Sequence, residues 1–274
     1  SALEAHGWSW HGAGDLVRIG HREVGLWVNQ LDGTFASVGA HDWPELEADE
    51  IGILSDLDGS GTVDLLRIDT DGSQPWRYWS PIVQRPGLLQ AQENGLGYRV
   101  TLRYQPAAQL AADDAAAGEP WSSTPPGPAP VLVATVESDG ADWTRTTNYH
   151  PRDGWHDPER GELRGFAEHA HTRDGDNYSS AATVTRRYDL GRDDEARGLQ
   201  LLEEITSGEN GALLSELHTL EAEDLAPGVR TARRIATDTF QLEAGPEDAA
   251  ARVRTEWDHD AAGNVTEERA LGRV

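Results

Sequence analysis

The chain has 274 residues, with 48 acidic and 23 basic side chains and a formal net charge of −25 at pH 7. This acid excess disfavours binding to nucleic acids and anionic membranes, whose charge has the same sign. Because cysteine is absent, neither a disulfide nor a thiol nucleophile is available. No apolar run reaches the ~18 residues of a membrane span, and no signal peptide is recognisable. The absence of methionine suggests a processed chain or a segment of a longer protein.

Pairs of Asp or Asn with Gly divide the chain into short segments. Such pairs suit tight hairpin turns, whose central residues adopt positive φ. They occur at residues 32–33, 71–72, 139–140, 153–154, 174–175 and 210–211. Alternating polar and apolar runs lie between several of them, for example at 144–149 and 182–188, and this period is typical of half-buried strands. The predicted fold is therefore all-β.

Residues 1–80 contain an imperfect internal repeat, in which residues 12–19 resemble residues 60–68. Each copy precedes a segment with Trp, at 26–28 and 76–79. A repeat of ~45–50 residues with this pattern favours partial β-propeller blades of the FG-GAP/VCBS type. We expect the Trp side chains to lie in the blade core, in preference to stacking on sugar rings. They are Trp8, Trp10, Trp27, Trp76 and Trp79.

The second copy of the repeat carries an acidic loop at residues 56–64. Its candidate ligand oxygens stand at alternate positions: Asp56, Asp58, Ser60, Thr62 through its carbonyl, and Asp64. Ca²⁺ takes six to eight oxygen ligands, and glycines let a short loop curl around the ion. The loop is not an EF-hand, because no Glu stands at the twelfth position. Two interpretations remain, a structural Ca²⁺ site and an acidic turn without an ion. The first copy lacks the leading acids and is expected to bind no ion.

The rest of the chain is predicted as two further regions. Residues 81–130 comprise a connector rich in Pro and Gly, a strand at 98–104 and a Pro-rich loop at 124–130. Residues 131–274 are predicted as β-hairpins. The segment 199–220 contains good helix formers, but Asn210 and Gly211 separate two runs of similar length, which fits a hairpin better. The chain ends in a strand–turn–strand pattern at 257–269.

Three motifs resemble the B subunits of Tc toxins, the SpvB-like family with a TcdB middle region. The first is Asn94-Gly95-Leu-Gly97 before a strand. The second is the run 149–166, whose most specific part is Glu162-Leu-Arg164-Gly165-Phe166, with Leu163 and Ala167 in place of the usual Phe and Gly. The third resembles an Rhs/YD repeat and comprises Trp257, in place of the usual Tyr, with Asp258, Gly263 and Asn264. Together the motifs extend the resemblance over nearly the whole chain.

The resemblance implies a secreted toxin assembly and a structural, non-enzymatic role. In that family a β-propeller is followed by long β-hairpins of an Rhs/YD-type shell. The hollow shell forms with a C-type subunit and encloses a toxic payload, while the propeller docks on a pore-forming A-type subunit. No catalytic residue of the family is expected in this segment. Two alternatives stay open: a Ca²⁺-dependent adhesion or glycan-binding propeller, and, as the weakest, a hydrolase, since no pair of acids is distinctive.

Histidines and arginines in the hairpin region give two further expectations. Imidazoles and carboxylates of the zinc-ligand type cluster at His150, His156, His169, His171, Asp153, Asp157 and Glu159. A His-x-His pair on a strand places both rings on one face, yet ordinary surface roles fit these residues better. We also expect arginines to pair with acids across neighbouring hairpins, each exposed pair contributing only ~0–1 kcal/mol. They are Arg145, Arg164, Arg186 and Arg187.

Overall fold

A computed structural model describes residues 2–6, 14–20, 23–42, 49–80, 87–123, 129–175, 180–191, 196–207, 211–226, 229–242 and 249–273. The all-β prediction is confirmed, since these residues form three antiparallel sheets and a short helix. The chain divides into two compact units. Unit 1 comprises residues 1–89, 105–109 and 127–130, and unit 2 comprises 90–104, 110–126 and 131–274. No helix in the described ranges is long and apolar enough to cross a membrane.

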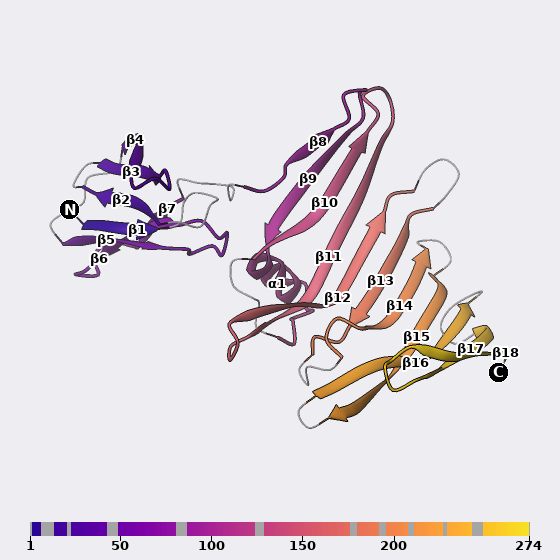
Figure 1. Ribbon diagram of the computed structural model, residues 1–274. Helices are drawn as coiled ribbons and strands as arrows, with labels where there is room; N and C mark the ends of the chain where they lie inside the picture. The colour runs from indigo at the N-terminus through magenta and orange to yellow at the C-terminus, as the bar shows by residue number, and fades with distance from the viewer. Residues whose placement is uncertain are drawn as a thin grey trace. The chain divides into compact units, whose positions relative to one another are not determined.

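Unit 1 contains two small sheets whose strands follow one another in chain order (Figure 1). The first sheet consists of β1 (Ala2–His6), β2 (Asp15–Ile19), β3 (Glu23–Asn29) and β4 (Phe35–Asp42). The second consists of β5 (Glu50–Ser55), β6 (Asp64–Asp69) and β7 (Arg77–Trp79). An up-and-down antiparallel sheet of about four strands is the unit from which propeller blades are built.

The internal repeat corresponds to equivalent strands of the two sheets. Strands β2 and β6 are each the second strand of their sheet, and each begins at a buried aspartate. The backbone amide of Asn29 donates to Asp15 Oδ1 at 2.9 Å, and that of Leu57 donates to Asp64 Oδ2 at 2.8 Å. Each aspartate therefore anchors a neighbouring loop or strand end. The other leading positions of the first copy, including Trp8 and Trp10, lie outside the described residues.

One apolar core lies between the two sheets. It comprises Val17, Ile19, Val24, Leu26, Leu54 and Leu65, with Val63 and Trp79 packed against it. Gly52 allows close contact, because a Cβ there would lie 3.2 Å from Cγ2 of Ile19. The core position expected for Trp76 is wrong: its side chain is 65% exposed. Trp76 lies just before the short strand β7. It is therefore outside the alternation of side chains that packs Trp79 against the core.

Equivalent residues of the two copies point to opposite faces of their sheets. Val17 and Ile19 face the shared core, whereas in β6 the core side is taken by Leu65. The repeat equivalents of Val17 and Ile19, which are Leu66 and Ile68, therefore lie on the far face of the second sheet. The two sheets thus pack front to back, as propeller blades do. A two-fold sandwich would instead bury the same face of both copies.

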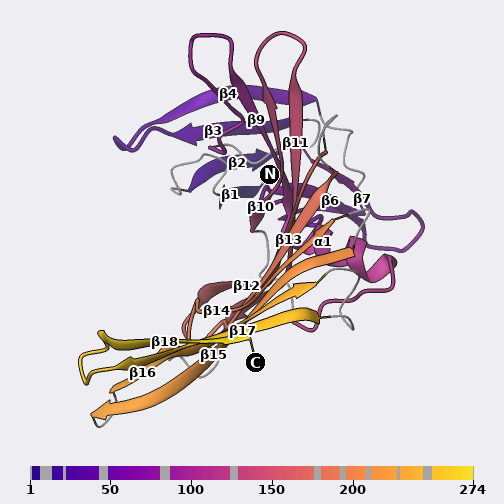
Figure 2. The same cartoon turned by 90° about the vertical axis from the view of Figure 1, so that its right-hand side faces the viewer.

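Unit 2 is built on one antiparallel sheet of eleven strands in chain order, β8 to β18 (Figures 1 and 2). Its first strands are β8 (Ala91–Glu93), β9 (Arg99–Pro106), β10 (Pro130–Ser138), β11 (Thr144–Asp157), β12 (Glu162–Arg173) and β13 (Ala182–Tyr188). The others are β14 (Gln200–Ser207), β15 (Gly211–Ala226), β16 (Val229–Leu242), β17 (Ala249–His259) and β18 (Val265–Arg273). The segment 199–220, ambiguous in sequence, is the β14–β15 hairpin, and the strand–turn–strand at the end of the chain is confirmed.

Two local features of unit 2 differ from the sequence expectations. Helix α1 (Ala107–Ala116) occupies an Ala-rich segment for which we expected no helix. A turn was expected at Asp153-Gly154, but β11 continues through it and pairs with β12 on both sides, at Arg152 and at Gly154. Asp153 has a φ of 52°. Its carboxylate accepts hydrogen bonds from the amide and hydroxyl of Ser122, which hold this strained residue inside the strand.

Candidate functional site

The acidic loop between β5 and β6 brings its three aspartates together. One carboxylate oxygen each from Asp56, Asp58 and Asp64 lies within 4.8 Å of the others. Two glycines allow this curl, with φ values of 71° at Gly59 and 77° at Gly61. The hydroxyls of Ser60 and Thr62, in the same loop, lie 2.8 Å apart. The alternate spacing predicted from sequence therefore produces one cluster of oxygens.

Backbone amides satisfy part of this cluster and leave one oxygen without a partner. The amide of Gly61 donates to Asp56 Oδ2 at 2.9 Å, and that of Ser60 donates to Asp58 Oδ1 at 2.9 Å. Asp56 Oδ1 is buried, and no residue in the described part of the chain hydrogen-bonds to it. Burial raises the pKa of Asp56 against the effect of the Gly61 amide, and the charge of Asp58 raises it further. A hard cation would offset both the burial of the charged Asp56 carboxylate and its repulsion by Asp58, so the residues fit Ca²⁺.

Sequence reasoning overlooked a second acidic cluster at the other end of β6. Carboxylate oxygens of Asp49, Asp69 and Asp71 also lie within 4.8 Å of one another. The D-x-D-G-S spacing of residues 56–60 recurs at residues 69–73, and this recurrence was the available signal. Asp69 is buried, and it accepts hydrogen bonds from the Ser73 hydroxyl and from backbone amides of its own loop. Its oxygens therefore already have donors from the turn that follows.

The Glu162–Phe166 motif lies where β12 begins, and its centre is a buried arginine. The Arg164 side chain is 2% exposed, donates to Asp157 Oδ2 at 2.8 Å, and lies over the Trp155 ring at 5.7 Å. A hydrogen bond from Arg164 lowers the pKa of Asp157. Arg164 therefore joins β12 to β11 beside the turn of their hairpin. The sequence predicted that this arginine pairs with an acid, and the pair it forms is buried.

Other residues of the Glu162–Phe166 motif contact segments outside the β11–β12 hairpin. Gly165 has a φ of 107°, a conformation that favours glycine. Phe166 packs edge-on against Trp121 with 6.0 Å between ring centroids. Glu162 accepts a 2.6 Å hydrogen bond from Arg197, which belongs to the segment before β14. The motif therefore joins two other parts of unit 2, the segment after α1 and the segment before β14, to one hairpin.

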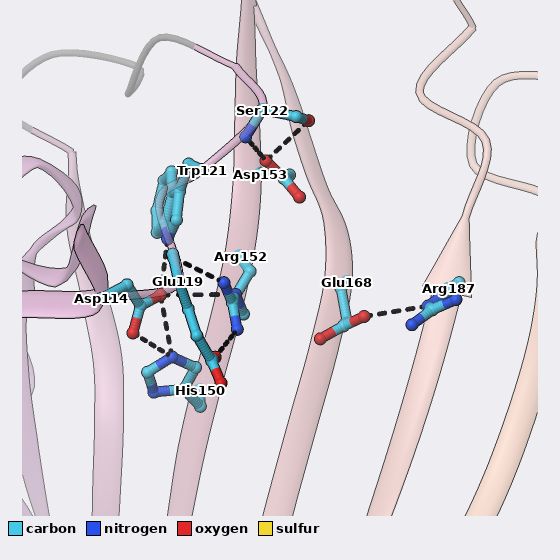
Figure 3. A network of polar contacts seen from close by, with 9 residues as sticks. All are labelled: Asp114, Glu119, Trp121, Ser122, His150, Arg152, Asp153, Glu168 and Arg187. Atoms are coloured by element: carbon cyan, nitrogen blue, oxygen red, sulfur yellow. Dashed lines mark hydrogen bonds and ion pairs between the residues drawn. The ribbon is translucent and has the colours of Figure 1, made fainter. Parts of the chain in front are cut away.

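A polar network fixes the segment after α1 to one face of β11 (Figure 3). Asp114 on α1 accepts a 2.6 Å hydrogen bond from Trp121 Nε1 and lies 2.9 Å from His150 Nε2. Arg152 donates to the carbonyl of Glu119 at 2.8 Å. Burial opposes ionisation of Asp114, but bonds from Trp121 and His150 outweigh it and lower its pKa. Neither Asp114 nor Trp121 could be singled out from the sequence, because their partners are 30 or more residues away or in an unexpected helix.

The first family motif shapes a hairpin tip. Asn94 Oδ1 accepts hydrogen bonds from the amides of Leu96 at 2.8 Å and Tyr98 at 3.1 Å. Gly95 and Gly97 adopt positive φ. A Cβ at Gly140, in the next hairpin tip, would lie only 2.8 Å from the Gly97 carbonyl oxygen. The two tips therefore touch through backbone.

The Rhs/YD-like motif shapes the last hairpin. Asp258 pairs with Arg269 on the facing strand, and Trp257 lies beneath Arg234 at 5.0 Å. Gly263 has a φ of 86°, and the amide of Asn264 donates to Asp260 Oδ1 at 2.8 Å. The residue that closes this turn is thus Asp260, which sequence reasoning did not single out.

The His-rich cluster predicted as a possible zinc site is divided between the two faces of the sheet. His150 points towards Asp114, while Asp153 and Asp157 are bonded to Ser122 and Arg164. Only His169 and His171 remain together. The expected arginine pairs are present: Arg145 with Glu137 at 2.6 Å, Arg186 with Glu203 at 2.6 Å and Arg187 with Glu168 at 2.9 Å. Each of these pairs joins neighbouring strands.

These features define a β-sheet protein whose motif residues join hairpins to one another. Residues 47–191 match the family described as "Insecticide toxin TcdB middle/N-terminal region", which is more than half of the chain. The chain belongs to this family. No curated protein matches its sequence.

Solved structures share the fold over the whole chain. The Tc holotoxin pore of Photorhabdus luminescens matches with a TM-score of 0.81 and 15% identity, covering 99% of this chain and 16% of that one. The TcdB2–TccC3 crystal structure also gives 0.81 and 15%, covering 99% and 17%. A further form, TcdB2–TccC3–TEV, gives 0.78 and 17%, covering 95% and 16%. The chain thus spans about one sixth of the proteins it matches.

Replacing Arg164 with Met should lower the thermal midpoint of the chain by more than about 5 °C, because Asp157 loses the partner of a buried pair. The matched control is Arg187→Met, whose side chain is 60% exposed. Differential scanning calorimetry measures both. Equal midpoints for the two variants would show that the motif arginine has no special structural role.

Stability should also fall between pH 7.5 and pH 5.5. Buried His218 contacts the Thr237 hydroxyl at 2.9 Å, and burial, followed by the charge of Arg234, lowers its pKa. The folded state therefore keeps this imidazole neutral, while the unfolded chain binds a proton below about pH 6.5. Acidification thus favours unfolding. Thermal midpoints at both pH values, with His218→Gln as comparison, test this; an undiminished difference in the variant would contradict it.

Proposed function

We propose that the chain is a non-enzymatic structural segment of a secreted Tc/Rhs-type toxin complex. In this proposal unit 2 is part of the wall of a hollow β shell that encloses a toxic payload. The observation that carries it is the eleven-stranded sheet in which every strand pairs with its chain neighbours, with the fold of the TcdB2–TccC3 structures. Family membership supports the same role.

The strand order of unit 2 and its two sheet edges suit a segment of a shell wall. Strand pairing in chain order lets a sheet extend without a second layer. The sheet ends in β8 and β18, whose outer edges carry no further strand among the described residues. Exposed edges favour pairing with further β structure. We propose that the C-type subunit and further strands of the B-type subunit complete the shell there.

Unit 1 supports the second part of the proposal, a propeller that docks on a pore-forming A-type subunit. The far face of the second sheet carries Leu66 and Ile68 together with exposed Ile51, Ile53 and Tyr78. The first sheet buries the equivalent face. Because the two sheets pack front to back, this apolar face of the second sheet is available to a further blade. An incomplete propeller requires such a face.

Protease protection tests the enclosure. The full-length protein that contains this segment is co-purified with its C-type subunit and treated with protease. The payload region of the C-type subunit should resist digestion in the complex and be degraded when the C-type subunit is alone. Arg187→Ala, which removes one exposed pair, serves as the control and should leave protection unchanged. Equal digestion with and without the B-type protein would contradict an enclosing role.

We also propose that the acidic loop binds Ca²⁺ as a structural ion, which orders the turn before β6. The buried, unpartnered oxygen of Asp56 supports this proposal. Asp56, Asp58 and Asp64 would supply carboxylate oxygens, with Ser60 and Thr62 beside them. The ion would stabilise the end of unit 1 and take no part in a reaction.

Ca²⁺ should raise the free energy of unfolding of unit 1, by about 2.7 kcal/mol at a concentration one hundred times Kd. Asp58→Ala should abolish this gain. Asp32→Ala removes an exposed turn aspartate that contacts Thr34, and it should retain the gain. Denaturant unfolding with Ca²⁺ and with EDTA measures both. A wild-type chain indifferent to Ca²⁺ would favour the bare acidic turn.

A further inference from the structure

Two histidines on β12 form a pair that the contacts of the shell wall do not use. His169 and His171 lie on the same face of the strand, with ring centroids 6.2 Å apart. The Tyr149 ring lies beside both, at 5.9 Å from His169 and 6.3 Å from His171. The strand register explains this grouping, because Tyr149 stands directly opposite His171.

The nitrogens of these two rings differ in their partners from those of His150 and His218. His150 contacts Asp114, and His218 contacts Thr237. In the described part of the chain, no side chain hydrogen-bonds to the imidazole of His169 or His171. Both histidines are half-buried. A hollow of about 450 Å³ lies alongside, lined by His171 and Tyr149 among others.

The surroundings of both rings favour the neutral imidazole. Burial lowers the pKa of both imidazoles, and the charge of Arg186 lowers both further. Neutral imidazole is the ligand form, and no proton need be displaced at neutral pH. Two neighbouring imidazoles that resist protonation can still share one metal ion.

The separation of the rings is within reach of a shared ion. A metal–nitrogen bond is about 2.0–2.1 Å long, so the centre of each bound ring lies about 3 Å from the metal. Two such rings on one tetrahedral ion have centroids about 5 Å apart. From the observed 6.2 Å, side-chain rotation has to bring the rings about 1 Å closer. No hydrogen bond to another described side chain is lost in that rotation.

We propose that His169 and His171 form a bis-imidazole site for a divalent transition-metal ion such as Zn²⁺ or Cu²⁺. Imidazole selects these ions over Ca²⁺ and Mg²⁺, which prefer oxygen ligands. The hollow beside His171 would leave room for further ligands, either water or a side chain of an enclosed polypeptide.

The charged groups around the pair are mostly neutralised. Arg186 faces His169 from β13 and is paired with Glu203 at 2.6 Å. Arg145 is paired with Glu137 on the far side of the hollow. Arg173, two residues beyond His171, is exposed to solvent, which screens its charge. A divalent ion at the pair therefore meets little uncompensated positive charge.

Metal titration of the tag-free, 274-residue chain tests the proposal. Isothermal titration at pH 7.5 is done in excess Ca²⁺, which occupies oxygen sites. We expect one ion per chain, with Cu²⁺ bound more tightly than Zn²⁺. His169→Gln and His171→Gln should each weaken binding by at least about tenfold, while His150→Gln, on the opposite face, should retain wild-type affinity. Undetectable binding at millimolar metal, or equal affinities in all variants, would overturn the proposal.

Electron paramagnetic resonance of the wild-type Cu²⁺ complex gives a reading that does not depend on the folding of the variants. Two imidazoles should produce hyperfine splitting from two nitrogens, and the signal should be lost as the pH falls to 5.5 and protons compete for the rings. A spectrum with oxygen ligands only would assign the ion to carboxylates and overturn the bis-imidazole site.

Discussion

Among the described residues, the eleven-stranded sheet of unit 2 is covered by α1 and the segment after it at β11, and no second sheet packs on it. Most of this sheet therefore has to be stable without a two-sided core. The buried apolar side chains of unit 2 among the described residues are few: Leu110, Ala111, Ala134, Pro151, Leu190 and Ala236. The clustered core belongs to unit 1. In unit 2, hydrogen bonds between neighbouring strands, reinforced by ion pairs across them, replace apolar burial. Single exposed pairs contribute little, so buried contacts such as Arg164–Asp157 and the Asp114 network carry more of the structure.

The same constraint connects structure to function. Strands paired with chain neighbours form a continuous surface whose length grows with each hairpin, and such a surface can surround a volume. Its motif residues lie where continuity is most easily lost: beside the turn of the β11–β12 hairpin, at two touching hairpin tips, and in the final turn closed by Asp260. The proposed enclosing role requires no catalytic group, and the motif contacts described above join neighbouring parts of the sheet.

Period-2 alternation was the most reliable signal in the sequence. It predicts 182–188 as a strand, and β13 has these bounds. The acidic loop, the repeat and the arginine pairs follow equally from local spacing. Long-range contacts could not be predicted: the burial of Arg164 depends on Trp155 and on strand pairing, and Asp153 stays inside β11 through Ser122. Helix α1 was missed because its Ala-rich composition stands beside a Pro-rich loop, and Trp76 because a three-residue strand has too little alternation to orient it.

The central claim is that unit 2 is a single-layer wall segment of a toxin shell. Electron cryo-microscopy of the full-length protein bound to its C-type subunit tests this most directly. The account predicts that a further strand pairs with β18, and that one face of the β8–β18 sheet borders an enclosed cavity. A β18 edge left in solvent, or a sheet covered on both faces by packed domains, would contradict it.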